Sequence, residues 1–315
     1  MATTLNHVEM NFSSGLNALN RKKTQIVTRR HFETFGDFYE YIIDADEAGV
    51  EGFHDSSQRE HKERQTESNW TLNASYADAK DLAVNGWPKG REMMEGKMSD
   101  ALNSHAIPEI QPSWSTGEWG FFVDIGAYSA GDPMCVLHPD EQTSLTNNVV
   151  KLRVSLACAF GVDGEMKANW GTAIAFLILQ LQGQGKQVAV EACYYTEKHA
   201  GCQRDLKKVG QNYLTTITLK QAGEPLDLDR VAYVVAHPAA HRRLIWRTRE
   251  IEKTLKNGYG TPRPLPDTDE PNMINIEGVQ FNQRHSLTVD AAIAEVTKIY
   301  NRQVGKLDAL DMTEA

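Results

Sequence analysis

An arginine-rich segment that contains a tryptophan is the strongest local cluster of charge in this chain. Residues 241–249 read HRRLIWRTR. Arginine binds phosphate oxygens and stacks on bases, so this composition fits contact with nucleic acid. Two glutamates, Glu250 and Glu252, follow directly, and arginine stems also cover domain surfaces, so a protein-facing surface fits as well. The predicted interaction residues are Arg242, Arg243, Trp246, Arg247 and Arg249.

Histidines and cysteines in the same half of the chain have spacings that can be tested for zinc binding. His237 and His241 are four positions apart, as are two zinc ligands on one helix face in zinc proteases. Pro238 stands where those enzymes carry the glutamate that acts as base, so we expect the two histidines to be structural or exposed. Cys193, His199 and Cys202 offer three ligands, whereas a structural zinc takes four. We therefore predict neither a metal nor a cofactor.

Two apolar segments indicate the fold class. Val149–Phe160 and Gln187–Tyr195 are rich in valine and alanine and are typical of strands buried on both faces. The stretch 165–183 between them is long enough for a crossover helix. The pattern predicts a β-α-β unit within a three-layer α/β domain over residues 149–315. In this unit Val154 and Ile174 are expected in the core, whereas Lys167 is expected to tolerate alanine.

The elements that follow complete the predicted domain. The segment YLTTITLKQ alternates apolar and polar residues and predicts a third strand. A helix is expected after this strand, and Pro238 is expected to break that helix. Residues 257–285 are expected to be irregular, and a last helix is expected from Leu287 to Val304. Neither GxGxxG, a phosphate loop ending in GK[ST], nor GxSxG occurs, so no nucleotide site and no serine nucleophile is predicted.

The preceding half of the chain divides into three predicted regions. Residues 1–53 are expected to form a loosely held tail, up to about residue 30, and a helix with an aromatic core-facing stripe. Residues 54–69 are wholly polar and indicate a linker. Residues 70–148 predict a helical and irregular connector laid against the α/β domain, with Ser75 and Asp78 forming a capping box.

Bulk composition excludes some classes of protein. A formal net charge of −9 argues against non-specific coating of nucleic acid, which needs a basic surface. No apolar stretch approaches the length of a membrane span, and the first residues lack the apolar core of a signal peptide. The four cysteines form no CxxC pair, which fits reduced thiols in a cytoplasm.

The order of elements resembles that of a von Willebrand factor A domain. Such domains hold a metal ion after their first strand with the pattern DxSxS. Aligning the strands places Ser155, Ala157 and Ala159 at those three positions. None supplies a carboxylate, and the two alanines supply no side-chain oxygen, so the resemblance implies a site that has lost its metal.

A wider resemblance rests on three segments taken together. Asn69–Gly90 ends in GWPKG, AGDPMCVL follows later, and residues 227–246 read DLDRVAYVVAHPAAHRRLIW. They are similar to an uncharacterised family encoded mainly by bacteriophages, which implies a phage source. We expect a non-enzymatic interaction protein in the host cytoplasm, partnered by another protein such as an ATPase. The alternatives are a nucleic-acid-associated protein that uses residues 241–249, a hydrolase that uses His237, His241 or Asp163, and a structural component of the virion.

Overall fold

The computed structural model describes most of the chain as a mixed α/β protein. The described residues are 6–12, 23–50, 69–104, 114–117, 122–139, 149–158, 162–197, 212–252, 260–267, 270, 272–279 and 287–314. The predicted linker, 54–69, lies outside them except for Asn69.

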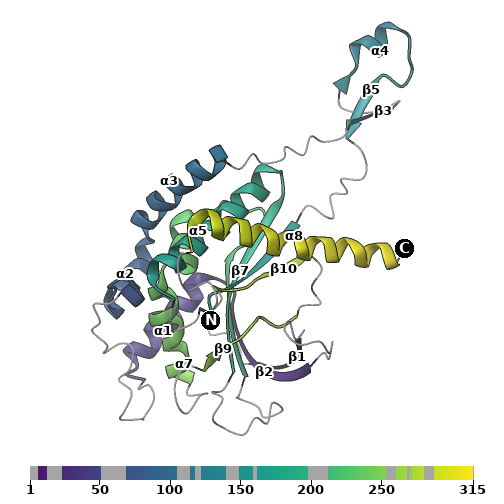
Figure 1. The fold of residues 1–315 in the computed structure, drawn as a ribbon. Coiled ribbons are helices and arrows are strands. Elements are labelled where there is room, and N and C mark those ends of the chain that lie inside the picture. Colours follow the sequence, from purple (N-terminus) through teal and green to yellow (C-terminus); the bar gives the residue numbers. More distant parts are fainter. Residues whose placement is uncertain are drawn as a thin grey trace.

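The main sheet has its strands in the order β1-β2-β8-β7-β6-β10, and the short β9 pairs with the end of β7 (Figure 1). Strand β7 is antiparallel to β8 and parallel to β6, which is in turn parallel to β10. Strand β2 runs parallel to β8, and β1 is antiparallel to β2 at the edge. The strand bounds are Asn6–Phe12 for β1, Lys23–Phe32 for β2, Val149–Ser155 for β6, Gln187–Glu197 for β7, Asn212–Lys220 for β8, Thr261–Pro262 for β9 and Met273–Ile276 for β10.

The predicted β-α-β unit is confirmed. Strand β6 leads into α5 (Gly164–Gly183), and β7 follows alongside β6 in parallel. Val154 and Ile174 are fully buried, as expected from the apolar pattern. The third predicted strand is β8, although it pairs with β7 in the antiparallel direction. Strand β10, which lies in the segment predicted to be irregular, adds a parallel strand on the other side of β6.

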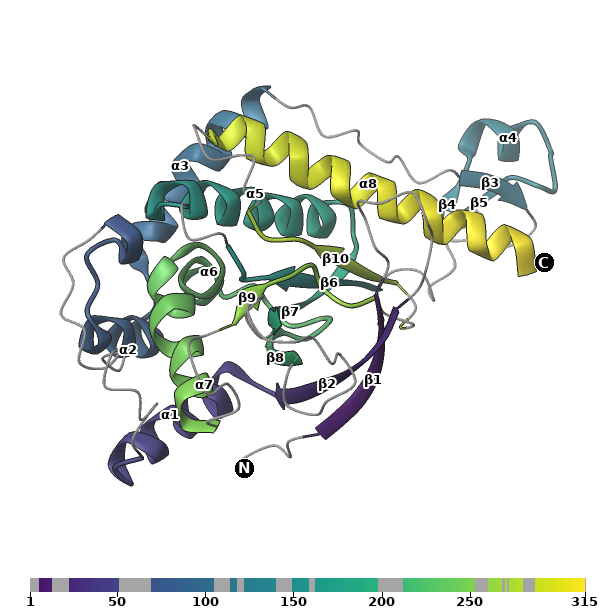
Figure 2. The same cartoon turned by 60° about the horizontal axis from the view of Figure 1, so that its bottom comes forward.

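The described helices cover one face of the main sheet (Figure 2). Apolar side chains of α1, α5 and α8 share one core with the inward-facing residues of the strands. The opposite face carries a smaller cluster in which Leu265, from a non-helical segment, packs on the strands. The described residues therefore form a helical layer and a sheet, and the three-layer expectation is not met by them. The helix bounds are Phe35–Glu47 for α1, Tyr76–Asn85 for α2, Pro88–Ser104 for α3, Leu228–Val231 for α6, Trp246–Glu252 for α7 and Val289–Glu314 for α8, and a 3-10 turn, η1, spans Asn69–Thr71.

The first residues of the chain belong to the sheet. We expected residues 1–30 to be loosely held, but 6–12 and 23–32 are β1 and β2. The prediction was wrong because β2 carries adjacent arginines that look like surface residues and are paired in the folded protein: Arg29 approaches Glu191, and Arg30 contacts Glu252. The aromatic helix α1 does face the core, through Phe35 and Phe38.

The helix around Pro238 changes its winding on both sides of the proline. After α6, residues Ala232–Ala236 form a π-helical segment, η3, that ends at His237. A second π-helical segment, η4, spans Ala240–Ile245 and continues into α7. The predicted break at Pro238 is confirmed. Wider π turns are rare and frequently mark functional sites, so this stretch merits close inspection.

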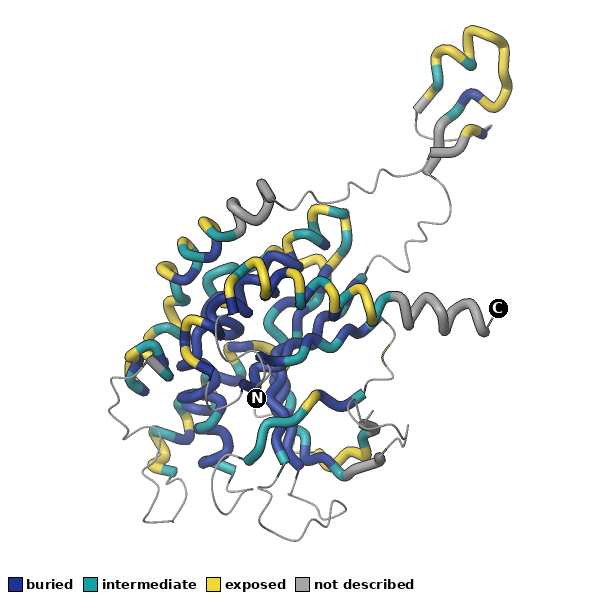
Figure 3. Tube along the Cα trace, in the orientation of Figure 1, coloured by how far each residue is buried: buried dark blue, intermediate teal, exposed yellow. Residues whose placement is uncertain are grey.

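Residues between 114 and 139 form a second, three-stranded sheet in the order β3-β5-β4. With the helix α4 (Ile125–Ser129), these strands make a unit that we call the small sheet unit: β3 spans Trp114–Gly117, β4 Phe122–Val123 and β5 Val136–Pro139. We expected this region to lie against the α/β domain. In Figures 1 and 2 it instead stands apart from the main sheet and its helices. Figure 3 shows that its described residues are largely exposed.

Candidate functional site

The carboxyl end of β6 is where an open α/β sheet is expected to bind a ligand, because the chain leaves this strand toward both neighbours. Here the space is closed by backbone. Gly278, just after β10, lies so near Ala157 that an added Cβ would sit 1.7 Å from the Ala157 carbonyl oxygen. The Ser155 hydroxyl accepts a hydrogen bond from Ala157 N. Asp163 caps α5 by accepting from Met166 N, so its carboxylate serves the helix.

A cysteine, a histidine and an arginine meet directly beyond this strand end. Arg242 Nη2 lies 3.2 Å from Cys158 Sγ and donates to the Val162 carbonyl at 2.8 Å. His241 Nδ1 lies 3.8 Å from the same sulfur. The π-helical segment η4 carries both His241 and Arg242 toward β6. The sequence analysis treated Cys158 as a strand residue in the core and missed this cluster, because the partners are more than 80 residues apart.

Lys167 also lies at this end of the sheet, fully buried. Its ammonium group donates to the Leu156 carbonyl at 3.4 Å. Burial lowers the pKa of Lys167 to about 8, a nearby Cys158 raises it, and the Arg242 charge lowers it further. Lys167 is therefore a core residue rather than a surface one, and its tolerance of alanine stays a prediction. The lysine lies on the inner side of α5, in a helix that is buried almost all round.

The five predicted interaction residues lie in or next to the core. Arg243 donates to the Ala74 carbonyl, and Arg247 pairs with Asp46 at 3.0 Å and with Glu250 at 3.2 Å. Arg249 donates to two carbonyls, those of Tyr194 and Tyr213, and its guanidinium lies 3.5 Å above the Tyr213 ring. Each of these arginines and Arg242 is buried, and Trp246 is half-buried. Trp246 Nε1 donates to the Tyr194 hydroxyl and to His241 Nε2.

This placement changes what the arginines can do. Guanidinium groups that bind phosphate must reach solvent, and these four do not. In this structure they join η4 and α7 to the surrounding elements. Their role in an interaction stays a prediction, and it would require the segment to leave the core. Residues 241–249 were predicted to be an interaction surface from their local sequence alone. The local sequence does not reveal acidic partners that distant helices supply.

The histidine and cysteine spacings do not come together as a metal centre in the described part of the chain, where no group of three or more His, Cys, Asp or Glu side chains has such an arrangement. The His237 ring accepts a hydrogen bond from Ala239 N, while His241 faces Cys158. Burial and then the Lys167 charge lower the pKa of His237 to about 4. His199 and Cys202 lie outside the described residues.

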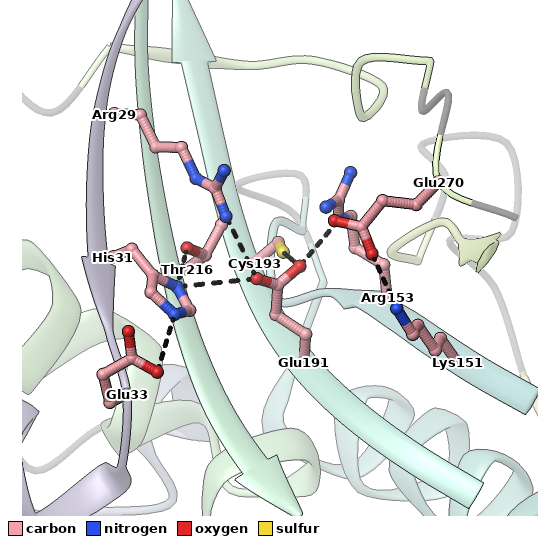
Figure 4. Close-up of polar contacts among 9 residues, drawn as sticks. All are labelled: Arg29, His31, Glu33, Lys151, Arg153, Glu191, Cys193, Thr216 and Glu270. Atoms are coloured by element: carbon pink, nitrogen blue, oxygen red, sulfur yellow. Dashed lines mark hydrogen bonds and ion pairs between the residues drawn. The ribbon is translucent and has the colours of Figure 1, made fainter. Parts of the chain in front are cut away.

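A second polar cluster occupies the face of the main sheet that is opposite the helices (Figure 4). Glu191 on β7 lies at its centre. Its carboxylate accepts from Arg153 Nε at 2.7 Å and lies 3.5 Å from Arg29 Nη2. His31 Nδ1 lies 2.8 Å from the Thr216 hydroxyl and 3.6 Å from Glu191. These residues are neighbours across strands, because Arg153 pairs with Glu191 and His31 with Thr216 in register.

The chemistry of this cluster is that of a structural tie between strands. Burial opposes ionisation of Glu191, but the charge and hydrogen bond of Arg153 together with the Arg29 charge outweigh it and hold the pKa of Glu191 below its ordinary value. Burial and then the Glu191 charge raise the pKa of the Cys193 thiol, which donates to Glu191 at 3.6 Å. A carboxylate held ionised and a thiol held protonated suit neither acid catalysis nor nucleophilic attack.

The small sheet unit exposes the largest apolar side chains of the described surface. Its apolar tip, defined as residues 123–134, exposes 76% of Ile125 and 68% of Tyr128. Val123 and Met134 are exposed at the same tip. We expected this region to pack against the α/β domain as part of the connector 70–148. The Asp, Gly and Pro residues in this segment favour turns, and this pattern indicates that its apolar side chains are exposed to solvent.

A family model described as a domain of unknown function, DUF7192, matches residues 20–303. The chain belongs to the DUF7192 family. The match runs from just before β2 into α8, so the DUF7192 region includes the whole of the main sheet except β1, together with the small sheet unit. No curated protein and no solved structure matches the chain.

Within the described part of this DUF7192 chain, no helix is both long enough and apolar enough to cross a membrane. This agrees with the hydropathy pattern of the sequence. The described residues thus offer three candidate sites: the strand end at Cys158, the strand tie at Glu191 and the apolar tip.

Proposed function

We propose that the protein is a non-enzymatic interaction protein and that its apolar tip docks a partner protein. The observation that carries this proposal is the grouping of exposed Val123, Ile125, Tyr128 and Met134 on one short loop. Single exposed apolar residues are ordinary on protein surfaces. Several large ones on one turn, with an aromatic among them, are typical of the centre of a protein–protein contact.

The tip is held in shape before any partner arrives. Asp124 accepts hydrogen bonds from the backbone of Gly126 and Ala127 and so caps α4. Asp124 N donates to the Cys135 carbonyl at 2.7 Å, and Asp132 N donates to the Ala127 carbonyl at 3.0 Å. A loop that is already ordered loses less entropy on binding, so more of the apolar contact energy appears as affinity.

Charge indicates what kind of partner fits. The stretch 122–139 contains Asp124 and Asp132 but neither lysine nor arginine. An acidic rim around apolar residues complements an apolar pocket edged by basic side chains. The same rim repels phosphates, which disfavours a nucleic acid or an anionic lipid surface as the occupant. The proposed occupant is therefore a protein with an apolar, basic-edged pocket.

A photo-crosslinking experiment tests this function. A photoreactive residue replaces Tyr128 in one variant and Val84 in a control, because these positions are 68% and 64% exposed. Crosslinking in the host cell is expected from position 128 and not from position 84. The crosslinked protein is then purified, and Ile125→Asp should weaken its binding at least about tenfold, or about 1.4 kcal/mol, without changing the melting temperature.

Other results of that experiment would contradict the proposal. Crosslinking from position 128 only to a second copy of this chain would make the tip a self-association surface. Crosslinking only to lipid, equal crosslinking from both positions, or unchanged affinity for Ile125→Asp would each exclude tip docking.

The finer fold proposal is a von Willebrand A-like arrangement for residues 149–276. Its support is the path β6, α5, β7, then antiparallel β8, with the chain returning to β10 on the other side of β6. In such a domain the metal position would lie near Ser155, where Lys167 and Arg242 now bring positive charge. Two buried cations disfavour a divalent metal there.

A bacteriophage source, a host-cytoplasmic setting and a role beside an ATPase also stay proposals. Their support is the resemblance carried by residues 69–90, 130–137 and 227–246. The third of these segments forms α6, η3 and η4. The second overlaps the apolar tip at residues 130–134, which include Met134, so the resemblance and the proposed docking surface share residues.

A further inference from the structure

Arg242 is a buried cation without a carboxylate partner in the described residues. Its guanidinium donates to the carbonyl oxygens of Trp70 and Val162 and to Cys158 Sγ. Burial lowers the pKa of Arg242, and the adjacent Cys158 opposes that shift most strongly. A buried charge is costly unless an opposite charge lies beside it. Arg242 thus places a cation 3.2 Å from the Cys158 sulfur, while the Asp163 carboxylate, which forms no ion pair with it, opposes the lowering of its pKa less strongly.

His241 presents a second donor to the same sulfur. Trp246 Nε1 donates to His241 Nε2 at 3.1 Å, so Nε2 accepts and the ring proton of a neutral His241 is on Nδ1. Nδ1 is the atom that faces Cys158 Sγ at 3.8 Å. Two N–H donors therefore point at one sulfur, and they can stabilise negative charge that develops on the sulfur or on an oxygen bound to it. The buried Lys167, whose pKa is lowered by burial, raised by Cys158 and lowered by Arg242, adds a second cation nearby.

We propose that Cys158 is a nucleophilic cysteine, with its sulfur positioned between Arg242 and His241, and that it is a site of oxidation by hydrogen peroxide. Only 7% of Cys158 is exposed, so a reagent must be small and uncharged to reach it. This site is separate from the apolar tip, and it does not rest on the proposed docking function.

The reaction balances with peroxide as the only oxidant. A sulfur lone pair attacks one peroxide oxygen, so that an S–O bond forms while the O–O bond breaks. The departing oxygen takes the proton released by the thiol and leaves as water. Cys158 is oxidised by two electrons to sulfenic acid, and the peroxide is reduced. Arg242 Nη2, which already lies within 3.2 Å of the sulfur, is placed to donate to the new oxygen.

The experiment compares cysteines within one native protein. The full chain is treated with hydrogen peroxide in the presence of dimedone, which traps sulfenic acid, and each cysteine is followed by peptide mass spectrometry. Cys135 is the matched control, because it is 8% exposed and lies in the small sheet unit. We expect trapping at Cys158 to be about tenfold faster or more than at Cys135 or Cys193, and we expect this advantage to vanish in denaturant.

Variants test whether the neighbours are responsible. Arg242→Gln and His241→Phe should each slow trapping at Cys158 several-fold while leaving Cys135 unchanged, provided that circular dichroism shows a folded protein. If neither variant folds, the comparison within the wild-type protein decides alone. Trapping at Cys158 that is no faster than at Cys135, or that is unaffected in a folded Arg242→Gln variant, would overturn the proposal.

Discussion

At the scale of single residues, this protein is distinguished by charged side chains in its interior. Arg249 donates to two carbonyls and lies on the Tyr213 ring, and burial lowers its pKa to about 9. Lys167 has a carbonyl as its hydrogen-bond acceptor. Carbonyl dipoles and aromatic faces thus support cations that in most proteins would be paired with carboxylates. Burying such charged groups costs folding free energy, so replacing them measures that cost.

Lys167→Met should stabilise the protein by about 1–3 kcal/mol at neutral pH, because it replaces a desolvated ammonium with an apolar chain of similar length. The folded-state pKa of about 8 lies below the ordinary value of 10.5, so between these pH values the unfolded chain binds a proton that the folded protein does not. Wild-type stability should therefore rise with pH across this window, relative to the variant. Urea denaturation at several pH values measures both effects.

Lys167→Ala is the control for packing. It removes the same charge but leaves a cavity, and we expect it to be less stable than Lys167→Met by about 2 kcal/mol or more. Wild-type and Lys167→Met curves that run parallel from pH 8 to 10.5 would show that the lysine stays protonated throughout and would refute the argument.

At the scale of elements, Arg247 joins α7 to α1, alongside a hydrogen bond from the Tyr41 hydroxyl to Glu252. Arg247 pairs with Asp46 on α1 and with Glu250 on its own helix, and it donates to the Val50 carbonyl. Arg247→Met would remove this cation from the buried Glu250, which typically costs about 3–5 kcal/mol, whereas the half-buried Asp46 keeps its contact with Lys80. Arg230→Met is the matched control, because Arg230 forms an exposed pair with Asp227 and should change stability by less than about 1 kcal/mol. Equal effects in thermal denaturation would show that the tie is not structural.

The sequence predicts those elements whose pattern is local. The β6-α5-β7 unit was found because a strand buried on both faces and a long apolar helix are both apolar over their whole length. The capping box at Ser75 and Asp78 was found because its two partners are three residues apart, and both of its backbone hydrogen bonds are present. Strands β1 and β2 were missed because their polar residues gain burial only from distant partners.

The candidate site was harder to predict for the same reason. Residues 241–249 carry repeated positive charge, as a surface helix does. The Asp46 carboxylate that pairs with Arg247 lies 201 positions away in the sequence. Cys158 could be assigned to a strand end, but its neighbours His241 and Arg242 are placed by a π-helical segment. Spacing rules for ordinary helices do not predict where such a segment directs its side chains.

At the scale of the whole molecule, the small sheet unit is separable from the main sheet in structure, and we expect it to be separable in stability. Deleting residues 114–139 should leave the melting temperature of the rest within about 3 °C, because the described core contains no side chain from this unit. The same deletion should abolish crosslinking to the partner. Differential scanning calorimetry of both proteins measures the first effect, and a large loss of unfolding enthalpy beyond the deleted residues would contradict it.

The pairing of β2 with β8 has a consequence for synthesis on the ribosome. Thr28 is in register with Tyr213, a separation of 185 positions. At about 5–20 residues per second, roughly 10–40 s pass between the emergence of β2 and that of its partner strand. During this interval β2 has no parallel neighbour, and pairings over so large a separation form slowly. The nascent chain must therefore be shielded from other unpaired strands until β8 has been synthesised.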